Sequence, residues 1–227
     1  MNDRPLIIAE RLKEIHKELA QATLVAVTKY SPVEDVVMAY EVGQFDFGEN
    51  RVADLKAKAD YFFDHQLSLV KWHFIGHLQS NKVKELLKIP NLYAIHSIDS
   101  IKLIQELIKH KDVFEGNRLN IFLQFNTSHE AEKSGFLTVD ELYEAINLIV
   151  KEPKFHFMGL MTMGTIRTET IAEEAKRCFT DLHNLKIQIE KNFHLDNLKL
   201  SMGMSGDYPI AIDAGSDFVR IGSKIFK

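Results

Sequence analysis

About eight short apolar runs divide the chain, and a longer segment with apolar residues at helical spacing follows most of them. Runs such as Leu24-Val25-Ala26-Val27 are apolar at consecutive positions, as expected when both faces of a parallel strand are buried. Strands that alternate with helices are typical of βα units around a parallel sheet. The predicted strands are residues 23–28, 45–47, 72–75, 92–96, 119–125, 156–160, 198–200 and 218–221.

The chain length favours a single (β/α)8 TIM barrel, because such barrels commonly contain about 200 to 250 residues and this chain has 227. No linker or low-complexity segment divides it, so residues 1–227 are predicted to form one domain. An extra N-terminal helix, residues 5–20, is expected to close the bottom of the barrel. The predicted helices between the strands are residues 33–42, 52–63, 82–88, 100–109, 139–150, 171–189 and 208–214.

An open doubly wound sheet is the alternative architecture. That fold usually carries a glycine-rich loop after its first strand. Here the first strand ends in Thr28-Lys29-Tyr30-Ser31, so the barrel is favoured.

Composition excludes several classes of partner and compartment. The net charge is −4, and no block of like charge is long enough for a nucleic-acid or membrane patch. No apolar run approaches the roughly 20 residues that span a bilayer. The N-terminal residues resemble neither a secretion signal nor a transit peptide. The single cysteine, Cys178, is expected to be a buried apolar residue in a reducing compartment, and a cytoplasmic location is predicted.

Chemistry in a barrel of this type is expected where the strands end, at the carboxyl-terminal rim. The residues there are polar and rich in glycine, unlike the apolar strands. They are Lys29, Gly48-Glu49-Asn50, Gly76-His77, His96, Asn126, Met161-Thr162, Ser201 to Ser205 and Arg220-Ile221-Gly222-Ser223.

Lys29 is the most specific of these residues. A lysine directly after a buried strand is expected to lie in a dry barrel mouth, where the charged ammonium is disfavoured. A neutral amine attacks aldehydes and forms a Schiff base. The ordinary alternative is a lysine that extends to water.

Two loops could hold a phosphate group, and both follow the last two strands, where barrels often bind phosphate. One contains Gly222 and Ser223 and the other contains Ser205. A lysine for an aldehyde together with a phosphate site is consistent with pyridoxal 5′-phosphate, but also with a Schiff-base aldolase acting on a sugar phosphate. Arg220 slightly favours the former, because a cation beside the pyridine nitrogen suits binding better than carbanion chemistry.

The sequence closely resembles the YggS/PROSC family of pyridoxal phosphate homeostasis proteins, which are related to the barrel domain of alanine racemase. The resemblance spans almost the whole chain. It rests on the motifs VAVTK at 25–29, FGEN at 47–50, HFIGHLQSNK at 73–82, KSG at 133–135, MGLMT at 158–162, LSMGMS at 200–205 and VRIGS at 219–223. The segment after Asn50 departs from the family pattern, as does the ending at Lys227. The second departure suggests that the last barrel helix is missing or is supplied by the N-terminal one.

The resemblance implies roles for eight residues. Lys29 would form the Schiff base with the cofactor, and Ser205, Gly222 and Ser223 would hold its phosphate. Arg220 would face the pyridine nitrogen, by analogy with the racemase barrel. Asn50, His77 and Met161 would lie near the cofactor, or would serve capping or packing.

The expected function is therefore that of a carrier which takes up, protects and releases pyridoxal phosphate. Apo forms of cofactor-dependent enzymes are its expected partners. The protein is expected to be a monomer or a weak homodimer. The alternative is a racemase of low or specialised activity, which needs a second acid or base group. Tyr30 is a weak candidate for that group, because adjacent residues near a strand end point in different directions. Glu49 is either a general base or a loop anchor. A zinc site at His73 and His77 is not favoured.

Overall fold

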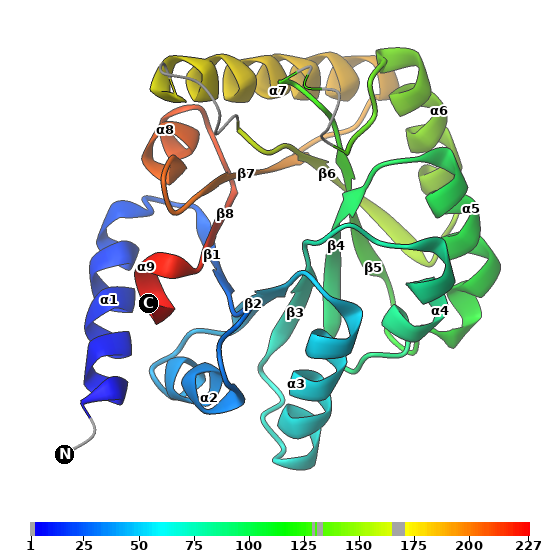
Figure 1. The fold of residues 1–227 in the computed structure, drawn as a ribbon. Coiled ribbons are helices and arrows are strands. Elements are labelled where there is room, and N and C mark those ends of the chain that lie inside the picture. Colours follow the sequence, from blue (N-terminus) through cyan, green and yellow to red (C-terminus); the bar gives the residue numbers. More distant parts are fainter. Residues whose placement is uncertain (1–2, 129, 131–133, 165–170) are drawn as a thin grey trace.

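The chain forms a closed barrel of parallel strands surrounded by helices, as a computed structural model shows (Figure 1). The structure describes residues 3–128, 130, 134–164 and 171–227. Each strand pairs with the next one along the chain, and β8 pairs back onto β1, where Val25 is opposite Arg220. The predicted (β/α)8 barrel is confirmed, and the open sheet is wrong.

All the strands predicted from the sequence are present, with ends that differ by a few residues. They are β1 Thr23–Val27, β2 Asp46–Glu49, β3 Lys71–Phe74, β4 Leu92–Ile98, β5 Leu119–Gln124, β6 Phe155–Met161, β7 Lys199–Met204 and β8 Phe218–Ile221. The largest difference is in β7. Its ladder continues to Met204, so Ser201 lies within a strand and not in the loop that the sequence suggested.

The predicted helices are also present, together with a single-turn helix, α9, that the sequence did not predict. They are α1 Arg4–Glu18, α2 Val33–Glu41, α3 Val52–Asp64, α4 Val83–Leu86, α5 Ile101–His110, α6 Val139–Val150, α7 Ile171–Phe193, α8 Tyr208–Asp213 and α9 Ser223–Phe226, with short 3-10 turns at Ser80–Lys82 and Lys111–Val113.

The N-terminal helix α1 does not close the bottom of the barrel as predicted. It lies in the outer ring, against α2 and the single-turn helix α9 (Figure 1). Arg4 and Arg11 on α1 donate hydrogen bonds to the carbonyl oxygens of Phe226 and Ile225. The apolar stripe of α1, which includes Ile8 and Leu12, needs a buried partner along its length, and it packs against α2 and α9. The N-terminal helix thus supplies the last helical position of the ring.

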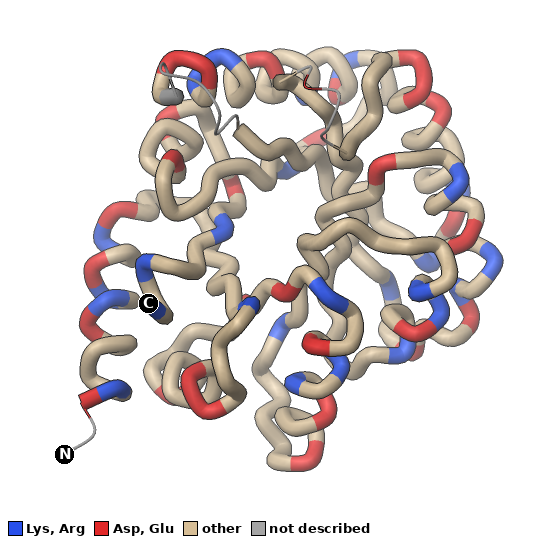
Figure 2. Tube along the Cα trace, in the orientation of Figure 1, with Lys and Arg blue, Asp and Glu red and all other residues tan. Residues whose placement is uncertain are grey.

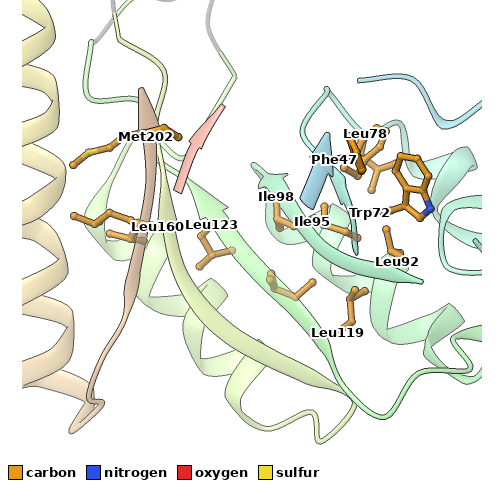
Figure 3. Close-up of a cluster of buried hydrophobic side chains, with 14 of the residues drawn as sticks. Phe47, Trp72, Leu78, Leu92, Ile95, Ile98, Leu119, Leu123, Leu160 and Met202 are labelled. Carbon is orange, nitrogen blue, oxygen red and sulfur yellow. The ribbon is translucent and has the colours of Figure 1, made fainter. Parts of the chain in front are cut away.

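Strand residues alternate between two separate cores. Those that point outward pack under the helices and include Phe47, Trp72, Ile95, Leu123, Leu160 and Met202 (Figure 3). The inward residues form a smaller apolar cluster of Val25, Ala94, Phe122, Met161 and Phe218. Because a strand has a side-chain period of two, this alternation decides which residues face the barrel interior.

Charged residues of both signs are interspersed along the outer helices, and the strands carry few of them (Figure 2). Among the described helices, none combines the length and the apolar character that a membrane crossing requires.

Substituting Gly159 by alanine should destabilise the barrel at the β6–β7 seam. Gly159 has φ +153°, and an added Cβ would lie 1.9 Å from the carbonyl oxygen of Lys199 on the neighbouring strand. The free energy of unfolding should fall by about 3 kcal/mol, from strain and overpacking together. Urea denaturation measures the change.

Gly206→Ala is the matched control, because an added Cβ there meets nothing within 4 Å. Its free energy of unfolding should stay within about 0.5 kcal/mol of the original. Equal stability of the two variants would contradict the close contact at Gly159.

Candidate functional site

Lys29 follows β1 at the carboxyl-terminal rim. It is in phase with Val25, which packs inside the barrel, whereas the Thr28 side chain between them donates a hydrogen bond to Glu49 at the end of β2. Lys29 is nevertheless exposed. The prediction of a dry environment for this amine is therefore wrong, because the rim loops leave the Lys29 side chain exposed.

A buried ion pair fixes the backbone just before Lys29. Glu49 at the end of β2 is completely buried and pairs with Lys58 of α3. The Thr28 hydroxyl donates to Glu49 over 2.7 Å, and Lys58 donates to the Thr28 carbonyl over 2.8 Å. Glu49 is therefore the loop anchor and not the general base, the two roles that the sequence left open.

The two phosphate-type loops meet beside the end of β1. The Gly222 amide donates to the Ser205 hydroxyl over 3.3 Å, which joins the loops that follow β8 and β7. A Cβ on Gly222 would lie 2.8 Å from the carbonyl oxygen of Val27, two residues before Lys29. Only a residue without a side chain allows this close approach. Ser223, the next residue, is exposed. The fold thus brings Lys29, Ser205, Gly222 and Ser223 to one part of the rim.

Arg220 lies deeper, inside the barrel, with 5% of its surface exposed. Its guanidinium donates to the Ser201 hydroxyl over 2.6 Å and to the Thr162 carbonyl over 2.9 Å. Burial lowers the pKa of Arg220 to about 10, which leaves the side chain positively charged at neutral pH. Arg220 is therefore a fixed cation below the rim.

The other three candidate residues have different surroundings. The backbone of Asn50 packs closely on Gly76. A Cβ added to Gly76 would lie 2.0 Å from the carbonyl oxygen of Asn50. The buried Asn50 Oδ1 has no hydrogen-bond partner in the described part of the chain. His77 is exposed and pairs with Asp99 over 3.2 Å. Met161 is 1% exposed and belongs to the interior apolar cluster.

A polar cluster that the sequence did not reveal lies inside the barrel below Arg220, and it includes His96, which was wrongly predicted to lie at the rim. His96 is hydrogen-bonded to the Ser201 hydroxyl over 2.7 Å and to the His73 ring over 2.8 Å. His73 contacts the carboxylate of Asp46 over 3.0 Å. Burial lowers the pKa of His73 and holds that of His96 well below 6.5. The alternation of side chains along a strand was the signal that could have revealed this cluster. His73 lies between Trp72 and Phe74, which point outward, so the His73 side chain faces the interior.

The interior position of His73 separates it from His77 at the rim, so the pair is not a metal site. In the described ranges, no group of three or more histidine, cysteine or acidic residues is placed to hold a metal ion. Lys133, which belongs to the motif at 133–135, lies outside the described residues.

Comparisons with known proteins identify relatives of the whole barrel. The alanine racemase N-terminal domain family matches residues 7–227. The human pyridoxal phosphate homeostasis protein is 38% identical over 212 residues, which cover 91% of this chain and 76% of the human protein. PipY of Synechococcus elongatus, solved with PLP bound, is 29% identical with a TM-score of 0.85, over 97% of this chain and 100% of PipY.

More distant structures share the fold alone. Alanine racemase from Corynebacterium glutamicum superposes with a TM-score of 0.73 at 15% identity, over 96% of this chain and 60% of the racemase chain. The barrel is therefore a unit that also occurs within larger proteins.

Replacing Lys58 by methionine should destabilise the protein strongly, because Glu49 would remain buried without its cationic partner. Breaking such a pair typically lowers the free energy of unfolding by about 3 to 5 kcal/mol. Chemical denaturation at pH 7 gives the value. The double variant Glu49→Leu with Lys58→Met should recover much of the loss, and a single variant as stable as the original would show that the pair anchors nothing.

Stability should fall as the pH is lowered from 7 to 5.5, because the two buried histidines are neutral in the folded protein and take up protons on unfolding. Their folded pKa values lie below 6.5, so the stability they contribute is present above that pH and is lost below it. Each contributes up to about 1.4 kcal/mol per pH unit. Urea titrations at several pH values measure how steeply the free energy of unfolding changes with pH. This slope should be smaller in His96→Gln, and an equal slope would contradict the conclusion that His96 is neutral in the folded protein.

Proposed function

Because the chain belongs to the alanine racemase N-terminal domain family, and within it to the pyridoxal phosphate homeostasis proteins, we propose that it binds pyridoxal 5′-phosphate and serves in the homeostasis of that cofactor. One observation carries the proposal. A lysine amine and two joined loops rich in amide and hydroxyl donors converge where β1 ends, and the cofactor offers an aldehyde and a phosphate.

Lys29 is the proposed attachment point. Its side-chain amine would hold the cofactor covalently through the aldehyde group, as a Schiff base. The bound cofactor supplies an electron-withdrawing ring. The ion pair of Glu49 and Lys58 supports this role, because it fixes Thr28 and hence the point from which the Lys29 side chain starts.

The donor set at the rim fits a phosphate group. Ser205 and Ser223 carry hydroxyl groups, and Gly222 carries an amide that a side chain would otherwise screen. The Gly222 amide donates to the Ser205 hydroxyl over 3.3 Å, a long contact, and an anionic acceptor would make a stronger hydrogen bond with that amide. We assign the phosphate to these three residues.

Arg220 is the proposed partner of the pyridine nitrogen. It remains cationic at neutral pH and is buried, so a nitrogen placed against it would stay unprotonated. Asn50 and His77 are proposed neighbours of the cofactor at the rim, with Asn50 Oδ1 in need of a donor. The packing of Met161 in the interior favours a supporting position below the cofactor.

We favour a carrier over a racemase. The relatives that resemble this chain over most of its length carry the name of homeostasis proteins. Of the two residues that the sequence offered as an acid or base, Tyr30 is 83% exposed and Glu49 is buried in an ion pair with Lys58. Apo forms of cofactor-dependent enzymes are the proposed partners, in the cytoplasm, with the protein as a monomer or weak homodimer.

Reduction of the loaded protein with borohydride should add one phosphopyridoxyl group to Lys29, because borohydride converts the carbon–nitrogen double bond into a stable amine. Peptide mass spectrometry locates the modification. Lys29→Ala should lose it together with the visible absorbance. Lys84→Ala is the matched control, since Lys84 is also exposed and lies on α4. Labelling of Lys29→Ala to the original extent would contradict the proposal.

A further inference from the structure

Five polar side chains form a continuous line of hydrogen bonds through the barrel interior. Asp46 on β2 contacts His73 on β3, and His73 contacts His96 on β4. The line then crosses the barrel to Ser201 on β7 and to Arg220 on β8. Asp46 begins β2, so the line starts near the amino-terminal end of the barrel and leads to the cation below the rim.

The two ends fix the direction of every hydrogen bond. The Asp46 carboxylate can only accept, so His73 carries its proton on Nε2 and, as a neutral ring, accepts at Nδ1. His96 then donates to that Nδ1 from Nε2 and, being neutral as well, accepts at its own Nδ1. The Ser201 hydroxyl proton is therefore directed to Nδ1 of His96, while the Ser201 oxygen accepts from Arg220, which can only donate. Both rings are neutral in this assignment, and all donors point from the cation to the anion.

Packing alone does not account for this arrangement. Barrel interiors are normally filled by layers of branched apolar residues. Here His73, His96 and Ser201 are all completely buried, and His96 stacks on Phe122 with 4.3 Å between ring centroids. A buried line of polar side chains is favoured over apolar packing only where every side chain has its hydrogen-bond partners and the fixed geometry serves a function. The one member that reaches the candidate ligand site is Arg220.

We propose that Asp46, His73, His96 and Ser201 are positioning residues for Arg220, which they hold in one orientation through a one-directional hydrogen-bond relay. Without His96 as acceptor, the Ser201 hydroxyl proton would be free to turn, and the lone pair that Arg220 uses would no longer be fixed. The relay couples a carboxylate near one end of the barrel to the cation that faces the ligand at the other. The ligand part of this inference rests on the proposed function, whereas the relay itself does not.

NMR on the ligand-free protein tests the relay directly. With 15N-labelled histidine, His73 and His96 should both show a protonated Nε2 and an unprotonated Nδ1 at pH 7. Arg220 should show separate Nη1 and Nη2 signals, because its two hydrogen bonds hinder rotation of the guanidinium. A proton on Nδ1 of His96, or averaged Arg220 signals, would overturn the relay.

Variants of His96 test whether the relay positions Arg220. His96→Gln retains one acceptor and one donor and should preserve the separate Arg220 signals, whereas His96→Leu should lose them. Affinity for pyridoxal phosphate is measured by titration of its visible absorbance. It should fall about tenfold or more in His96→Leu, because one charged hydrogen bond is no longer positioned, and less than about threefold in His96→Gln. Original affinity and absorbance maximum in a folded His96→Leu would overturn the proposal.

Asp46→Asn keeps the side-chain shape and removes only the charge, which makes it informative if His96→Leu fails to fold. It should shift the His73 and Arg220 signals and lower the affinity about two- to fivefold, as expected for a charge felt through hydrogen bonds. Asp64→Asn, at an exposed carboxylate at the end of α3, is the matched control and should change neither. If Asp46→Asn behaves like the control, the relay carries no influence. If the original protein does not bind pyridoxal phosphate, the proposed function fails, while the NMR result still decides the relay.

Discussion

Pairing of β8 with β1 is the constraint on which the rest of the structure depends. It sets Val25 opposite Arg220 and Ala26 opposite Ile221 and so closes the barrel. With this register, Gly222 follows directly beside Val27 at the rim. Residues almost two hundred positions apart in the chain therefore meet within a few ångströms, and every strand delivers its carboxyl end to the same rim.

The site has two parts with different physical environments. At the rim, Lys29 and Ser223 are exposed, and a reactive amine there can meet a ligand that arrives from water. Below the rim, Arg220 is buried and held by hydrogen bonds to a hydroxyl and a carbonyl. In the proposed function, the amine would be accessible to the cofactor, while recognition of the ring would depend on a group that water does not screen.

Buried charge stabilises this site from both sides of the barrel wall. The pair of Glu49 and Lys58 lies outside the strands and fixes the backbone before Lys29. The line from Asp46 to Arg220 lies inside them. Buried ion pairs add little net stability compared with apolar packing, but they require one arrangement of their neighbours. The two networks thus make the geometry of the rim specific more than they make the fold stable.

The sequence by itself determined the fold class, the strands and the rim positions of Lys29, Ser205, Gly222 and Ser223, because the continuous apolar runs and the helical spacing are local properties that burial in a parallel barrel imposes. Only the tertiary structure decided where α1 packs, that Lys29 is exposed, that Glu49 is an anchor and that Ser201 lies inside the barrel. Three of these depend on a tertiary partner: α9 for α1, Lys58 for Glu49, and His96 with Arg220 for Ser201. Such contacts follow from the register of the closed barrel, which a linear pattern of residues does not encode.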